Sequence, residues 1–167
     1  MARSRGTDLV IVVVALAVAA LATVGIIALG SQGSTDRSPV SRGEAIFQSG
    51  GDADGDLIPR SSSGGGMMGG GGMMGGGGCA TCHGTDGRGR TTAAFTAPNI
   101  TYGNLTDPRG MLEPDGGRGP TFSDATLRTA IIEGLDPEGS RLEAPMPQWQ
   151  LTSSEWTDLL AYLKTLK

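Results

Sequence analysis

Residues 79–83 read CATCH, and they hold both cysteines of the 167-residue chain together with its single histidine. The preceding residues, GGMMGGGG at 71–78, are glycine and methionine alone. Positions i and i+3 of a helical turn face the same side, so Cys79 and Cys82 can reach one object together. His83, at i+4 from Cys79, lies beneath the same face. The thiol and imidazole ligands of the chain are therefore concentrated in a single turn.

The C-x-x-C-H spacing is typical of covalent haem attachment, in which both thiols form thioethers with one porphyrin and the histidine binds its iron. A closed zinc site needs four cysteine or histidine ligands, and this chain has three. A thioredoxin-like dithiol would need a βαβ context that is not visible here, and a plain disulfide would leave His83 without a role. The pattern predicts one covalent haem c held by Cys79 and Cys82, with His83 on the iron.

The second iron ligand is expected to be a methionine thioether, because the chain has no second histidine. Met146 lies in APMP at 144–147, where two prolines fix φ and stiffen the loop before any ligand binds. Met111 lies in a loop rich in Gly, Pro and Asp, where no pair of directly flanking prolines stiffens the backbone. The methionines at 67–74 are too close to Cys79 in a glycine-rich run. Met146 is the predicted ligand, ahead of Met111 and of a role for Met146 as core filler.

An uncharged apolar run occupies residues 9–29. As a helix it would be roughly 31 Å long, which matches a bilayer core of roughly 30 Å. We expect a cytoplasmic leader at 1–8 and a single membrane anchor at 9–30, because a cleaved signal peptide usually has a shorter apolar region. Arg3 and Arg5 favour a cytoplasmic N-terminus, which places the following residues in the periplasm or another extracytoplasmic space.

A linker at 31–40 and an exported domain at 41–167 are expected after the anchor. Residues 31–167 carry 11 of the 13 basic and 16 of the 17 acidic residues, a formal charge of 11 minus 16, or −5. Binding to nucleic acid requires clustered cations on the protein. This charge balance therefore argues against a nucleic-acid partner.

Three helices are predicted in the exported domain, and no alternating strand pattern is present. Thr152 and Glu155 form a capping box before an apolar stripe that runs to the C-terminus. Ser123 caps a helix that Gly134 ends, and a shorter helix is expected at 41–48. The expected fold is all-α with a thin core, to which a buried porphyrin would add apolar mass.

The order of these features resembles the class I c-type cytochromes. The quoted motifs are GEAIFQSG, CATCHG, the proline of APNI, a middle helix ending in EG, and LEAPMPQW before a capped terminal helix. The resemblance implies that His83 and Met146 are the axial ligands and that the carbonyl of Pro98 accepts a hydrogen bond from the imidazole. Trp149 would pack near a haem propionate or in the core.

The chain departs from this family at an insertion, residues 51–78. It contains two copies of GGMMGG, at 65–70 and 71–76, for which a flexible loop is expected. A Cu(I) site on the four thioethers and a contact with a partner protein are the alternatives. The acidic stretch DADGD at 52–56 lacks the glycine and glutamate that an EF-hand calcium loop would place after it.

The expected function is electron transfer by a membrane-anchored mono-haem cytochrome, which is an electron carrier and not an enzyme. A mobile carrier that docks by electrostatic steering would be expected to have many surface lysines, and this chain has few. Together with the insertion, this favours a bound subunit of a respiratory or photosynthetic complex, similar to the mono-haem subunit of alternative complex III. Other redox proteins would be its partners. A haem-based sensor or peroxidase, with an open iron site, is the alternative function.

Overall fold

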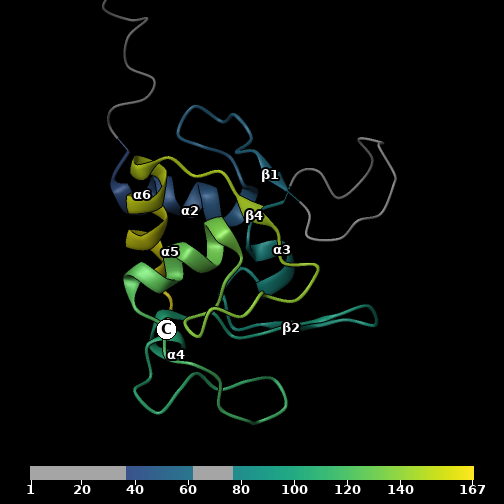
Figure 1. Ribbon diagram of the computed structural model, residues 1–167. Helices are drawn as coiled ribbons and strands as arrows, with labels where there is room; N and C mark the ends of the chain where they lie inside the picture. The colour runs from purple at the N-terminus through teal and green to yellow at the C-terminus, as the bar shows by residue number, and fades with distance from the viewer. Residues whose placement is uncertain (1–36, 62–76) are drawn as a thin grey trace, which may run out of the picture. The chain divides into compact units, whose positions relative to one another are not determined.

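The computed structural model describes residues 37–61 and 77–167 (Figure 1). The predicted leader and anchor, the linker up to residue 36 and both GGMMGG copies lie outside these residues. In the part of the chain that is described, no helix is long and apolar enough to cross a membrane.

Helix α2 (Pro39–Ser49) begins two residues before the expected start of this helix. The side chain of Ser38 accepts a hydrogen bond from the backbone N–H of Ser41, and Pro39 occupies the first turn, where its missing N–H costs nothing. Gly50 ends the helix with φ at 75°, in the left-handed region that glycine adopts without strain.

The other two predicted helices are confirmed with their caps. Helix α5 (Asp124–Glu133) begins at a capping box that Ser123 forms with Thr126, and ends at the left-handed Gly134. Helix α6 (Ser153–Leu163) begins at the capping box of Thr152 and Glu155. Helix α3 (Ala80–His83) is the single turn expected at CATCH, whereas α4 (Tyr102–Leu105), also a single turn, was not predicted.

The all-α prediction needs correction, because the described residues also form two short antiparallel sheets. Strand β1 (Arg60–Ser61) pairs with β4 (Gln148–Trp149), and β2 (Arg90–Thr91) pairs with β3 (Thr96–Ala97). Each strand has two residues, which is too short for the alternation of apolar and polar residues that identifies a strand in sequence. These ladders form where folding brings loops together.

Helices α2 and α6 lie side by side and form the main helix pair of the described residues (Figure 1). Phe47 is fully buried and Leu159 is 1% exposed. Arg42 on α2 binds both carboxylate oxygens of Asp158 on α6, at 2.7 and 2.8 Å. The main cluster of buried side chains comprises Ile46, Phe47, Ile58, Ala80, Trp149, Leu151, Leu159, Tyr162 and Leu163.

Gly43 permits this close approach of the two helices. A Cβ atom at this position would lie 1.9 Å from the backbone oxygen of Asp158. We therefore expect Gly43→Ala to destabilise the protein by about 3 kcal/mol, because backbone cannot give way as a flexible side chain can. Guanidinium unfolding of the haem-loaded protein measures the effect. Gly103→Ala is the control, since its Cβ would meet no atom within 4 Å; an equal loss in both variants would contradict the close-approach explanation.

A second buried cluster lies between α4, α5 and the loop after α4. It comprises Leu105, Met111, Phe122, Leu127 and Ala130. Helix α5 is joined to its neighbours by Asp124, which accepts a hydrogen bond from the Tyr102 hydroxyl on α4 and one from Lys164 after α6, each at 2.7 Å.

The first part of the insertion is packed against the domain and is not a free loop. Ile58 is 5% exposed and belongs to the main cluster. Its N–H donates to the carbonyl of Gly50. The carboxylate of Asp52 accepts hydrogen bonds from the backbone N–H groups of Asp54 and Asp56, both at 2.9 Å. The acidic stretch thus forms a turn that the Asp52 side chain closes by accepting from the backbone.

Candidate haem-attachment site

The CATCH stretch forms one tight turn, as its spacing predicts. The backbone N–H of His83 donates to the carbonyl of Cys79 at 2.9 Å, and that of Cys82 donates to the same carbonyl at 3.2 Å. Both cysteines are half-buried free thiols. The turn therefore offers two thiols one helical turn apart, which is the arrangement that double thioether attachment needs.

Two glycines in front of the turn fix its position against α2. The N–H of Gly78 points to the carbonyl of Gln48 at 3.4 Å, and a Cβ on Gly78 would lie 2.2 Å from the carbonyl oxygen of Phe47. A Cβ on Gly77 would lie 2.0 Å from the side chain of Thr81. The last two glycines of the run are thus required by close packing. They directly follow the GGMMGG copies, and no sequence signal predicts this requirement.

His83 is held by Pro98, the contact that the family resemblance implies. Nδ1 of His83 lies 2.9 Å from the carbonyl oxygen of Pro98. A carbonyl oxygen only accepts, so Nδ1 must carry the proton in this bond, and Nε2 then has the lone pair that a metal requires. Burial lowers the pKa of His83, against the opposing effect of the Pro98 hydrogen bond, and so favours the neutral imidazole.

The loop between His83 and Pro98 folds back, so that the Pro98 carbonyl reaches the imidazole of His83. Gly89 donates its N–H to the carbonyl of His83 at 2.8 Å, and the N–H of Ile100 donates to the carbonyl of Gly87 at 2.7 Å. Gly89 has φ at 90°, and a Cβ there would lie 2.7 Å from the carbonyl of Ala97. Glycine at this position therefore allows the two sides of the loop to meet.

The donors fit haem better than the alternatives. Burial raises the pKa of the Cys79 thiol to about 12, so the protonated form is favoured in the folded turn. Dithiol exchange requires the thiolate, and a closed zinc site would need a fourth ligand beyond Cys79, Cys82 and His83. Residues 37–61 and 77–167 also contain no group of three His, Cys, Asp or Glu side chains able to hold a metal ion. Two adjacent thiols and a neutral imidazole with Nε2 free match covalent haem.

The two candidate methionines lie in different surroundings. Met111 is 4% exposed and packs in the second buried cluster. Met146 is half-buried in a turn in which its N–H donates to the carbonyl of Glu143 at 3.1 Å. Trp149, three residues later, is buried in the main cluster, which agrees with the core role, one of the two roles expected for it. The ligation of iron by Met146 stays a prediction.

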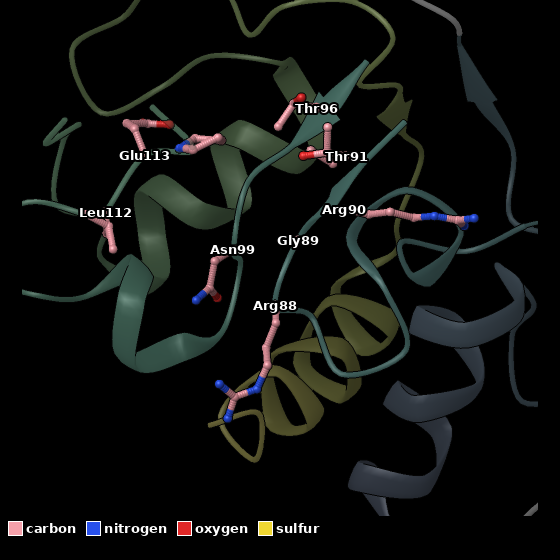
Figure 2. A pocket seen from close by; sticks show the side chains of 10 residues that line it. Arg88, Gly89, Arg90, Thr91, Thr96, Asn99, Leu112 and Glu113 are labelled. Carbon is pink, nitrogen blue, oxygen red and sulfur yellow. The ribbon is translucent and has the colours of Figure 1, made fainter. Parts of the chain in front are cut away.

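A pocket of about 350 Å³ opens beside Pro98, between the β2–β3 hairpin and residues 112–114 (Figure 2). Arg88 and Arg90, at its edge, point in different directions in Figure 2. Arg88 lies 3.7 Å from the Asp86 carboxylate, and Arg90 is within 3.5 Å of the Thr81 carbonyl. The two guanidinium groups therefore do not converge on one point in the pocket.

Arg60, in the insertion, contacts the site and was missed by sequence reasoning. It donates a hydrogen bond to the carbonyl of Gly77, and its guanidinium carbon lies 4.9 Å from the ring centroid of Trp149. Arg60 belongs to no recognisable motif, since it lies between a turn and a glycine-rich stretch, so no sequence signal identifies it.

The comparisons with known proteins agree with this geometry. The family model described as Cytochrome c matches residues 70–167, which is more than half of the chain and includes the CATCH turn, Pro98 and Met146. No curated protein and no solved structure matches the chain. The chain therefore belongs to the cytochrome c family, whose members carry covalent haem c, here at Cys79 and Cys82.

Proposed function

We propose that this protein is a membrane-anchored mono-haem cytochrome that passes single electrons as a bound subunit of a respiratory or photosynthetic complex. The observation that carries the electron-transfer role is the buried His83, whose Nδ1 is held by the carbonyl of Pro98 in the attachment turn of a cytochrome c family chain. Haem iron, when bound, takes up and releases one electron between its ferric and ferrous states. The chain's contribution is to hold the ligands still during that change.

His83 and Met146 are the proposed axial ligands. The Pro98 carbonyl fixes the orientation of the His83 ring, and Met146 lies in a turn that prolines flank on both sides. Met111 is already enclosed by Leu105, Phe122 and Leu127, which supports Met146 as the ligand. A ligand pair that stays in place in both oxidation states limits the reorganisation that electron transfer requires.

The anchor and the complex are proposed from sequence alone. Residues 9–30 would span the membrane with the N-terminus in the cytoplasm and the haem domain in the periplasm or another extracytoplasmic space. The exported region is acidic, and its two lysines lie at positions 164 and 167. A mobile carrier would ordinarily show a ring of charge that steers docking, so we propose permanent association with other redox subunits.

Gentle detergent extraction of native membranes tests this proposal. We expect the haem-stained band to remain in the membrane fraction after a high-salt wash and to migrate with larger subunits after extraction. Release by salt alone would contradict the anchor, and migration as a lone small haem protein would contradict the complex. Carbon monoxide binding to the ferrous protein at neutral pH would favour the sensor or peroxidase alternative, because it requires an open iron site.

A further inference from the structure

Residues 58–61 of the insertion connect two segments that are separate in sequence. On one side, β1 pairs with β4, with Arg60 opposite Trp149 and Ser61 opposite Gln148. The N–H of Gln150 donates to the carbonyl of Pro59 at 2.9 Å, which extends this contact by one bond. The segment of β4 follows Met146 by two residues. The insertion therefore binds the backbone immediately after the proposed ligand loop.

On the other side, the same segment contacts the residues that lead into the haem-attachment turn. Arg60 donates to the carbonyl of Gly77, two residues before Cys79. The indole of Trp149 lies against Gly50, where a Cβ would meet the ring at 3.0 Å. Arg60 thus contacts both the attachment side and the ligand-loop side of the site.

We propose that residues 58–61 form a strap that fixes the Met146 loop to the attachment turn, with Arg60 as the positioning residue that joins the two. This proposal rests on the proposed ligation of iron by Met146. Ile58 anchors the strap in the main buried cluster, and the β1–β4 ladder holds the segment after the loop. Arg60 then connects Trp149 to Gly77 through its stacking contact and its hydrogen bond.

The strap has a physical consequence for the ligand loop. Another contact holds this segment from a different direction, the hydrogen bond from the Gln148 amide to the Glu133 carbonyl at 2.8 Å. With the Arg60 side chain removed, the segment would keep that contact, the β1–β4 ladder and the packing of Trp149, but would lose the link through Arg60 to Gly77. The state in which the Met146 thioether has left the iron would then be more populated. An external ligand binds that open state, so its apparent affinity reports the open fraction.

Imidazole titration of the ferric, haem-loaded protein tests this proposal, followed through the loss of the far-red charge-transfer band of methionine-ligated haem. Arg60→Met keeps the aliphatic stem but loses the charge and the donors. Removing one hydrogen bond and one cation–π contact should raise the apparent imidazole affinity about tenfold. Arg60→Lys keeps a cation and a donor, and we expect it to restore most of the wild-type affinity.

Two control variants separate the strap from general effects of charge and stability. Arg88→Met removes the same charge from an exposed ion pair with Asp86, whose side chains are 64% and 63% exposed. Arg42→Met breaks the α2–α6 ion pair with Asp158 and lowers stability without touching the strap. Guanidinium unfolding of each variant gives its stability. We expect neither control to change imidazole affinity, even where Arg42→Met unfolds at lower denaturant.

Three results would overturn the strap. Unchanged imidazole affinity in Arg60→Met would show that Arg60 does not position the loop. An equal increase in Arg42→Met or Arg88→Met would show a general effect of stability or charge. A wild-type protein that lacks the far-red band would remove the proposed Met146 ligation itself, and this failure is distinguishable because it appears before any substitution is made.

Discussion

Replacing both cysteines of the attachment turn, Cys79→Ser and Cys82→Ser, is expected to abolish covalent haem and to leave little folded protein. Serine keeps the size of each side chain but cannot form a thioether. The core without haem is small, since the described residues form two buried clusters, one of nine side chains and one of five. A domain with so little buried apolar area depends on its cofactor for folding. Loss of attachment should therefore also be loss of stability.

Haem staining of denaturing gels and the intact mass of the purified chain measure this outcome. Both should show the haem adduct in the wild type and none in the double variant, made in cells able to attach haem. Thr81→Ser is the control, because Thr81 is exposed on the same turn and contributes no sulfur. A wild-type chain without the adduct, or a double variant that retains it, would contradict attachment at these residues. Circular dichroism of any soluble double variant reports the remaining helix content.

The helices were predictable because their signals are local. Ser123 and Thr152 stand at the N-termini and Gly50 and Gly134 at the C-termini, where capping chemistry favours these residue types. The CATCH turn was predictable for the same reason, since five consecutive residues contain its whole pattern. Local chemistry of this kind is readable without knowing what the element packs against.

The contacts that assemble the site were less accessible, because they join distant residues. The requirement for glycine at position 78 comes from the carbonyl of Phe47, 31 positions earlier, and nothing near Gly78 shows it. The pairing of Arg60 with Trp149 joins two strands of two residues each. The His83–Pro98 contact was expected only from the family resemblance, and no periodicity indicates it. The flexible loop expected for the two GGMMGG copies lies outside the described residues, and no sequence signal indicates that Ile58 and the strand after it pack on the domain.

The second large effect is expected at Met146. In Met146→His, the imidazole replaces a thioether on the iron and the site stays six-coordinate. Methionine ligation raises the reduction potential relative to histidine. Axial ligands together set haem potentials over a range of about 0.8 V, so we expect the potential to fall by some tenths of a volt. Potentiometric titration measures the change, and the far-red charge-transfer band should disappear in the ferric protein.

Met111→Leu is the matched control for this prediction. Met111 packs among Leu105, Phe122 and Leu127, so leucine at this position should cost little stability and leave both the potential and the far-red band unchanged. Loss of the band in Met111→Leu, with its retention in Met146→His, would assign the ligand to Met111. The stiff turn of Met146 and the buried cluster around Met111 both predict that the potential and the band change in Met146→His and stay unchanged in Met111→Leu. The pair of measurements therefore decides which thioether binds the iron.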